Sequence, residues 1–162
     1  MTGPLFSFTN KNRGYLMSDV TSIKSLLVPT KSTVLDVPGF TGFKVTVNFL
    51  TRDALANIRK KANTVNFSPR TRSTTESLNE ELFIELYTKA TIKNWEGLTY
   101  SHLANLAPVE LPDGFDVEKE IPFSEENAIN LMKSSSYFEG IITDAVTDLG
   151  VFTKNSKQKS EN

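Results

Sequence analysis

Two short segments in the first third of the chain place inward-facing residues at every second position. The members of the two faces are Thr33, Leu35 and Val37 in the first segment and Phe43, Val45, Val47 and Phe49 in the second. A spacing of two is the period of a strand with one buried face. The glycines of the connecting stretch 38–42 can take the positive φ angles that a hairpin needs. The pattern therefore predicts a two-stranded antiparallel ribbon.

A two-stranded ribbon has little independent stability in water, so its apolar face needs a cover. That cover is either the rest of the domain or a partner protein. We therefore name Phe43, Val45, Val47 and Phe49 as candidate partner-binding residues, with a place in the domain core as the alternative.

From Thr51 the apolar spacing changes to that of a helix. Thr51 is predicted to cap a first helix that begins at Arg52. Residues 63–75 are rich in Ser, Thr and Arg and are interpreted as an exposed, basic, flexible loop. A second helix is predicted from a capping box formed by Ser77 and Glu80, running to about Trp95 and stopping at Gly97.

Three further helical segments follow. A short helix is expected between Leu98 and Ala107, ended by Pro108, and residues 108–122 are interpreted as a loop. Ser124 is predicted to cap the next helix. The last helix is expected to begin at Ser136, which would form a capping box with Glu139. This helix is expected to bury Leu149 and to end at Gly150.

Strands first and helices after predict an α+β class, an N-terminal two-stranded β ribbon followed by a bundle of about four to five α-helices. We expect a flexible N-terminal extension over residues 1–22, a single domain over 23–152 and a disordered polar tail over 153–162. Met17 is an alternative translation start. No signal peptide or membrane span is recognised in the 162 residues, which predicts a cytosolic protein.

Composition argues against an enzyme and against a cofactor or metal site. The chain has no Cys and one His, His102, without an obvious orienting carboxylate. The net charge is −1, but it is unevenly distributed. Residues 1–72 hold eleven Lys or Arg and three acids, whereas residues 73–162 hold seven and sixteen. Such a chain can attract a charged partner or its own copies, although a basic solvated face explains the split equally well.

One basic patch is a candidate for nucleic-acid binding. It combines residues 59–61 with Arg70 and Arg72, and Phe67 lies between the two clusters. The acidic second half of the chain would repel phosphate, so nucleic acid is the less favoured partner. Trp95 is interpreted either as a packing anchor or as a binding hot spot.

Two separated motifs resemble those of the tail assembly chaperones of long-tailed bacteriophages. They are Lys93-Asn94-Trp95-Glu96-Gly97-Leu98 and, after a loop, Pro122-Phe123-Ser124-Glu125-Glu126-Asn127-Ala128 followed by Leu131. The turn Val37-Pro38-Gly39 adds to the resemblance, which spans about residues 24–150. The loop between Gly97 and Pro122 departs from the family pattern because it is longer.

The resemblance implies a protein that binds the tape measure protein, keeps it soluble and helps to recruit tail tube subunits. It implies action in the host cell cytoplasm and absence from the mature virion. We name the area around Trp95 and Phe123 as a second candidate partner-binding region, with self-association also expected. The alternatives are a structural tail component (tube, completion or terminator protein) and a small DNA-binding regulator.

Overall fold

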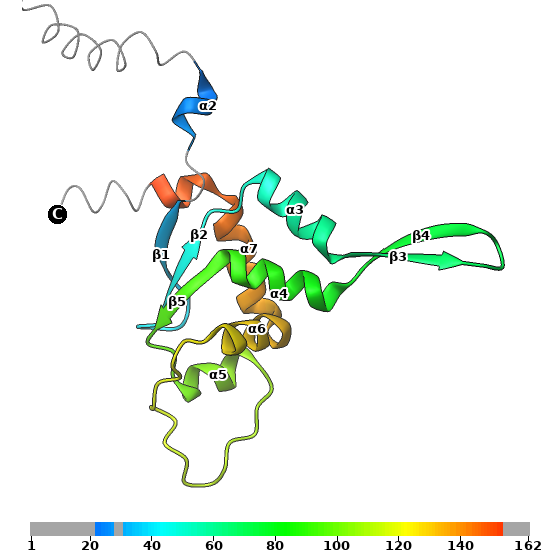
Figure 1. The fold of residues 1–162 in the computed structure, drawn as a ribbon. Helices are drawn as coiled ribbons and strands as arrows, with labels where there is room; N and C mark the ends of the chain where they lie inside the picture. The colour runs from blue at the N-terminus through cyan, green and yellow to red at the C-terminus, as the bar shows by residue number, and fades with distance from the viewer. Residues whose placement is uncertain (1–21, 28–30, 154–162) are drawn as a thin grey trace, which may run out of the picture.

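The computed structural model describes residues 22–27 and 31–153. Most of the predicted N-terminal extension, with Met17, and residues 154–162 of the predicted tail lie outside the described residues. In chain order the elements are α2 (Ile23–Leu26), β1 (Ser32–Asp36), β2 (Lys44–Asn48), α3 (Arg52–Ala62), β3 (Asn63–Ser68), β4 (Ser73–Leu78), α4 (Glu80–Thr91), β5 (Ile92–Glu96), α5 (Tyr100–Leu106), α6 (Glu125–Ser134) and α7 (Ser136–Thr147). The α+β class is confirmed, but helices and two small antiparallel sheets are interleaved (Figure 1).

The predicted ribbon of β1 and β2 is confirmed, but it belongs to a three-stranded sheet of order β1-β2-β5. Both pairings are antiparallel, with Leu35 opposite Val45 and Val45 opposite Trp95. A register shift between Thr46 and Val47 interrupts the second pairing. Strand β2 is the central strand and has a neighbouring strand on each edge. One face of the sheet packs on the helices and is covered by them.

The predicted continuation of the second helix to Trp95 is wrong. Helix α4 ends at Thr91, and Ile92 is already extended, with φ −102° and ψ 122°. The chain passes directly from helix into β5 without a Gly or Pro. Trp95 is consequently a strand residue in the sheet, and Gly97 follows the strand instead of ending the helix.

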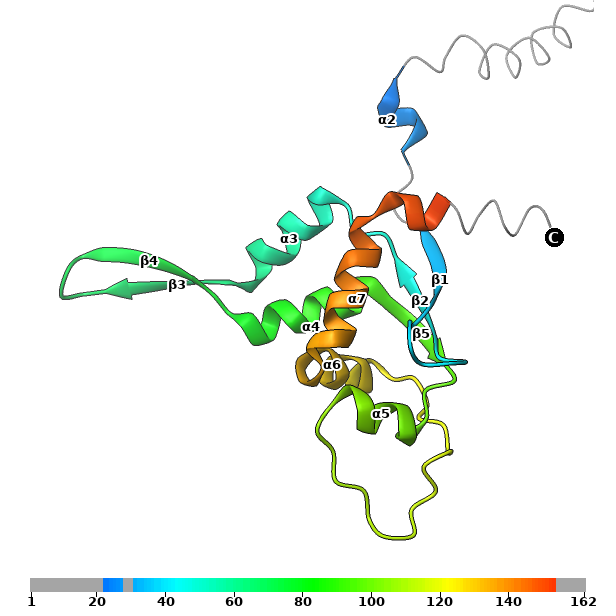
Figure 2. The same ribbon diagram turned by 180° about the vertical axis from the view of Figure 1, so that it is seen from behind.

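The predicted flexible loop over residues 63–75 is also wrong. Strands β3 and β4 pair in register from Asn63 opposite Leu78 to Ser68 opposite Ser73. This hairpin continues the packed pair α3 and α4, and the Asn79 N–H donates to the Ala62 carbonyl at 2.8 Å where helix and strand meet. In Figures 1 and 2 the hairpin extends away from the body of the molecule. We call residues 63–78 the arm.

Helix caps confirm part of the sequence prediction and correct the rest. The Thr51 and Ser124 hydroxyls accept hydrogen bonds from Ala54 N and Asn127 N, as caps should. Asn79, however, replaces Ser77 as the cap of α4, because Ser77 belongs to β4. Ser135 likewise replaces Ser136 as the cap of α7.

The end of the last helix also differs from the prediction. Helix α7 ends at Thr147, before Gly150, and Leu149 is 52% exposed and not buried. The predicted short helix before Pro108 and the loop that follows it are confirmed by α5 and by the irregular segment up to α6.

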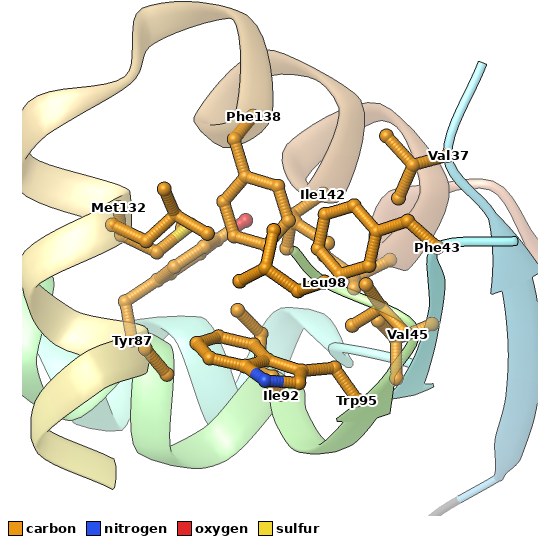
Figure 3. Close-up of a cluster of buried hydrophobic side chains, with 14 of the residues drawn as sticks. Val37, Phe43, Val45, Tyr87, Ile92, Trp95, Leu98, Met132, Phe138 and Ile142 are labelled. Carbon is orange, nitrogen blue, oxygen red and sulfur yellow. The ribbon is translucent and has the colours of Figure 1, made fainter. Parts of the chain in front are cut away.

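The core lies between the three-stranded sheet and helices α4, α6 and α7 (Figure 3). Phe43 is its centre: its ring stacks 6.0 Å from Phe138 and lies edge-on to Trp95 at 6.3 Å. The other buried apolar side chains of the core include Val37, Val45, Val47, Ile92, Leu98, Leu131, Met132, Ile142 and Val146. The sheet is therefore held to the helices by aromatic and branched apolar residues from both layers.

Candidate partner-binding site

The apolar face of the ribbon, our first candidate for partner binding, is inside the domain. Phe43, Val45 and Val47 are each 0% exposed. Phe49 is half-buried, with its ring edge-on to Phe152 at 5.5 Å. The alternative, a place in the domain core, holds for this face, because helices α4 and α7 pack on β2 and β5 pairs with its second edge. Phe43, Val45 and Val47 therefore form no accessible surface on the folded chain, and Phe49 keeps only part of its surface exposed.

Trp95 and Phe123, our second candidate region, lie in direct contact. Their ring centroids are 5.3 Å apart in an edge-on arrangement. The Trp95 Nε1–H donates to the Ile121 carbonyl at 2.9 Å, and the Ile121 N–H donates to the Leu98 carbonyl at 2.7 Å. The two motifs that are separate in sequence thus pair with each other. Trp95 is 5% exposed, so packing is its first role.

The second motif forms a closed turn at the start of α6. The Ser124 hydroxyl accepts from the Asn127 N–H at 3.0 Å, and the Asn127 side-chain amide donates to the Pro122 carbonyl at 3.1 Å. Glu125 and Glu126 stand in the first helical turn, where the macrodipole favours acids. Each polar residue of the motif therefore has a local structural role.

Gly97 ties the first motif to the β1–β2 turn. Its φ is +77°, a backbone conformation that favours glycine. A Cβ at this position would lie only 1.9 Å from the Gly42 carbonyl oxygen. The turn of the ribbon and the end of β5 therefore approach each other more closely than any side chain allows.

A groove opens beside the paired motifs. Its cavity of about 200 Å³ is lined mainly by apolar side chains of β5, α5 and α6 and of the loop that joins the two helices. The lining residues are Trp95, Leu98, Leu103, Ala107, Pro108, Val109, Ile121, Asn127, Asn130, Leu131 and Ser134. Benzene occupies an apolar cavity of about 150 Å³, so this groove can hold one large apolar side chain. Phe123 does not line it.

The sequence interpretation missed the α5 and loop side of this groove. Leu103, Val109 and Ile121 fall in the stretch that departs from the resemblance. The signal in the sequence was a series of apolar residues between Leu98 and Pro122. They stand in a stretch that is otherwise rich in acidic residues, so they indicate a buried or binding side of that stretch.

Comparison with known protein families now places the chain. The family described as YdaY prophage protein matches residues 48–162, well over half of the sequence. The chain belongs to this family. The matched region runs from the end of β2 and includes the arm, both motifs and the whole groove. Searches of the curated proteins and of the solved structures gave no match.

His102 and the acidic side chains are the candidate groups of this YdaY-family chain for a chemical or metal site. Residues 22–27 and 31–153 contain no group of three His, Asp or Glu side chains placed to hold a metal ion. His102 is the third residue of α5: its N–H donates to the Thr99 hydroxyl at 3.2 Å, and its ring stacks on Phe43. No helix within these same residues is long and apolar enough to cross a bilayer.

Proposed function

We propose that this prophage protein is a tail assembly chaperone that binds the tape measure protein, keeps it soluble and helps to recruit tail tube subunits in the host cytoplasm. The observation that carries the proposal is the contact between its two chaperone-like motifs. The rings of Trp95 and Phe123 join them, and each motif lines the apolar groove, the first with Trp95 and the second with Asn127. The motifs thus converge on one partner-sized surface feature.

A groove of this kind suits a helical client. The resemblance to tail assembly chaperones implies a tape measure protein that is long and helical. An amphipathic helix presents apolar anchor residues at spacings of three and four. One large anchor would enter the cavity beside Leu103 and Val109, while neighbouring anchors would lie along its rim. Asn130 and Ser134, on the exposed side of the lining, can hydrogen-bond to the client's polar flank. The proposal needs binding alone and assigns no catalytic residue, cofactor or metal.

Co-expression with the tape measure protein of the same phage tests the proposal. We expect the tape measure protein to be insoluble alone and to co-elute with this chain in size-exclusion chromatography. Val109→Asp, which places a charge in the groove, should reduce complex recovery at least about tenfold because a carboxylate cannot be buried there unpaired.

Val34→Asp is the matched control. Val34 lies on β1 at 41% exposure, against 38% for Val109, and does not line the groove. Both variants should keep the wild-type melting temperature within a few degrees. Recovery of a full-strength complex with Val109→Asp, or a tape measure protein that never co-elutes with wild type, would reject the proposal.

A structural tail component is the second candidate. Strands β3, β4 and β5 give the chain more β-structure than the two strands visible in the sequence, and tail components are rich in strands. Mass spectrometry of purified virions separates the two functions, because a structural component persists in the particle and an assembly chaperone does not.

A further inference from the structure

The arm has one fully polar face and one face, called apolar below, on which its three apolar side chains, Val65, Phe67 and Leu78, lie beside Asn63, Thr74 and Glu76. In the antiparallel register Val65 lies opposite Glu76, Phe67 opposite Thr74 and Asn63 opposite Leu78, so these side chains share a face. The opposite face holds only hydroxyl and amide side chains: Thr64, Asn66, Ser68, Ser73, Thr75 and Ser77. Thr64 and Ser77 hydrogen-bond to each other there at 3.0 Å.

The apolar face of the arm has no cover within the described chain. Val65 and Phe67 are each 62% exposed. A two-stranded hairpin has little stability by itself, and apolar side chains at its surface favour a further contact. The tip adds two arginines, Arg70 and Arg72, which make no ion pair among the residues that the structure describes. The arm is thus an apolar and basic surface that lacks a counterpart.

A surface of the complementary kind lies on the α5–α6 loop. Phe115 and Val117 are exposed large apolar residues of this loop. They alternate with acidic residues, among them Asp113 and Glu118, and in the described part of the chain neither of these two carboxylates is in an ion pair. We call residues 110–120 the acidic loop. The acidic loop therefore offers apolar area to the apolar face of the arm and negative charge to the two arginines at the tip of the arm.

The arm cannot reach the acidic loop of its own chain. In both views the arm extends to one side of the molecule, and the loop between α5 and α6 lies at the bottom, well away from the arm (Figures 1 and 2). We propose that the arm of one copy docks on the acidic loop of a second copy, Val65 and Phe67 against Phe115 and Val117, with Arg70 and Arg72 facing the acids. This goes beyond the proposed chaperone function and does not depend on it.

Such a contact joins two different surfaces. Each copy keeps a free arm at one side and a free acidic loop at the other, so copies add head to tail and form a ring or an open chain. Self-association of this geometry would place successive copies side by side, with their grooves repeated at a fixed spacing.

A charge-swap experiment tests the interface in the full chain. Arg70→Glu/Arg72→Glu makes the arm acidic, and Asp113→Lys/Glu118→Lys/Glu120→Lys makes the loop basic, with four Lys against two acids. In sedimentation velocity at low salt, with a concentration series up to roughly millimolar, wild type should associate. Each variant alone should associate at least about tenfold more weakly, because like charges then meet at the interface.

Mixing the two variants should restore association, since every acidic arm then meets a basic loop and every basic arm an acidic loop. Lys93→Glu/Lys133→Glu, which changes the net charge as much as the arm reversal, should associate as wild type does. Phe67→Ser should weaken association without any change in charge.

Three results would overturn the interface. They are a wild-type chain that stays monomeric throughout the series, reversal variants that associate normally, and a mixture that fails to recover. If duplex DNA binds wild type with a steep salt dependence and the arm reversal abolishes that binding while self-association is unchanged, the arm is a nucleic-acid contact instead. Tape measure solubility is measured separately with the groove variant, so failure of one proposal leaves the other distinguishable.

Discussion

Replacing Gly97 by Ala tests whether the close approach of β5 to the ribbon turn holds the fold together. Two costs apply. Alanine at φ +77° costs about 1–2 kcal/mol, offset by about 0.4–1 kcal/mol from a less flexible unfolded chain. The second cost is steric: the Gly42 oxygen would have to move by roughly 1.5 Å, from 1.9 Å to an ordinary contact of 3.4 Å. Inserting a methyl group into so close a contact costs about 1–3 kcal/mol, although Gly42 lies in an exposed turn and Gly97 is half-buried.

Gly114→Ala is the matched control, because Gly114 has φ +78° and nothing within 4 Å of the added Cβ. The control should lose no more than about 1.6 kcal/mol. We expect Gly97→Ala to lose about 1–3 kcal/mol more than the control, seen as a melting temperature about 2–12 °C below that of Gly114→Ala in circular dichroism. Equal melting temperatures for the two variants would refute the argument, since they would show that the contact with Gly42 has no energetic role.

Three smaller perturbations test other parts of the structure. Ser135→Ala should cost about 1–2 kcal/mol in urea denaturation, because this buried hydroxyl caps α7, whereas Ser136→Ala should change stability by less than about 0.5 kcal/mol. Trp95→Phe should cost about 2 kcal/mol, measured by circular dichroism, because it removes the donor to the Ile121 carbonyl; an unchanged stability would mean that this bond is not needed. Burial raises the pKa of Tyr87, so its contribution to stability is complete below about pH 10 and declines as pH rises above that value; Tyr87→Phe should flatten this alkaline loss in denaturation series at pH 9 to 11.

The sequence pattern was sufficient for the β1–β2 ribbon and for most helices. Strict alternation from Phe43 to Phe49 and the positive φ of Gly39 and Gly42 follow from local chemistry alone. Hydroxyl caps at Thr51 and Ser124 are equally local. These elements need no knowledge of the rest of the chain, which is why one-dimensional patterns predict them.

The missed elements depend on contacts distant in sequence. Strand β5 continues a helical apolar pattern, and only pairing with β2 makes Ile92 to Glu96 extended. The arm was hidden because its turn places Arg72, not Gly or Asn, at a positive φ of 51°. The alternation of Val65 and Phe67 with polar residues was its only local signal.

The candidate site was predictable in part. The motifs identified Trp95 and Phe123 correctly as neighbours, now seen 5.3 Å apart. Their pairing through Ile121 and the groove beside it required the return of the chain from α5 to α6, which no spacing rule specifies. The choice between core and partner surface for the ribbon face depends on the helices that cover it and on β5, which completes its sheet, and the local pattern shows neither contact.

Site-specific photo-crosslinking in the co-expressed complex tests the central claim most directly. A photoreactive residue is placed at position 109 in the groove or at position 34 on β1, and the products are identified by mass spectrometry. If the groove holds the client, position 109 forms an adduct with a helical segment of the tape measure protein and position 34 forms none. Adducts of equal yield from both positions, or no tape measure adduct from position 109 in a complex that does form, would contradict the claim that the groove holds the client.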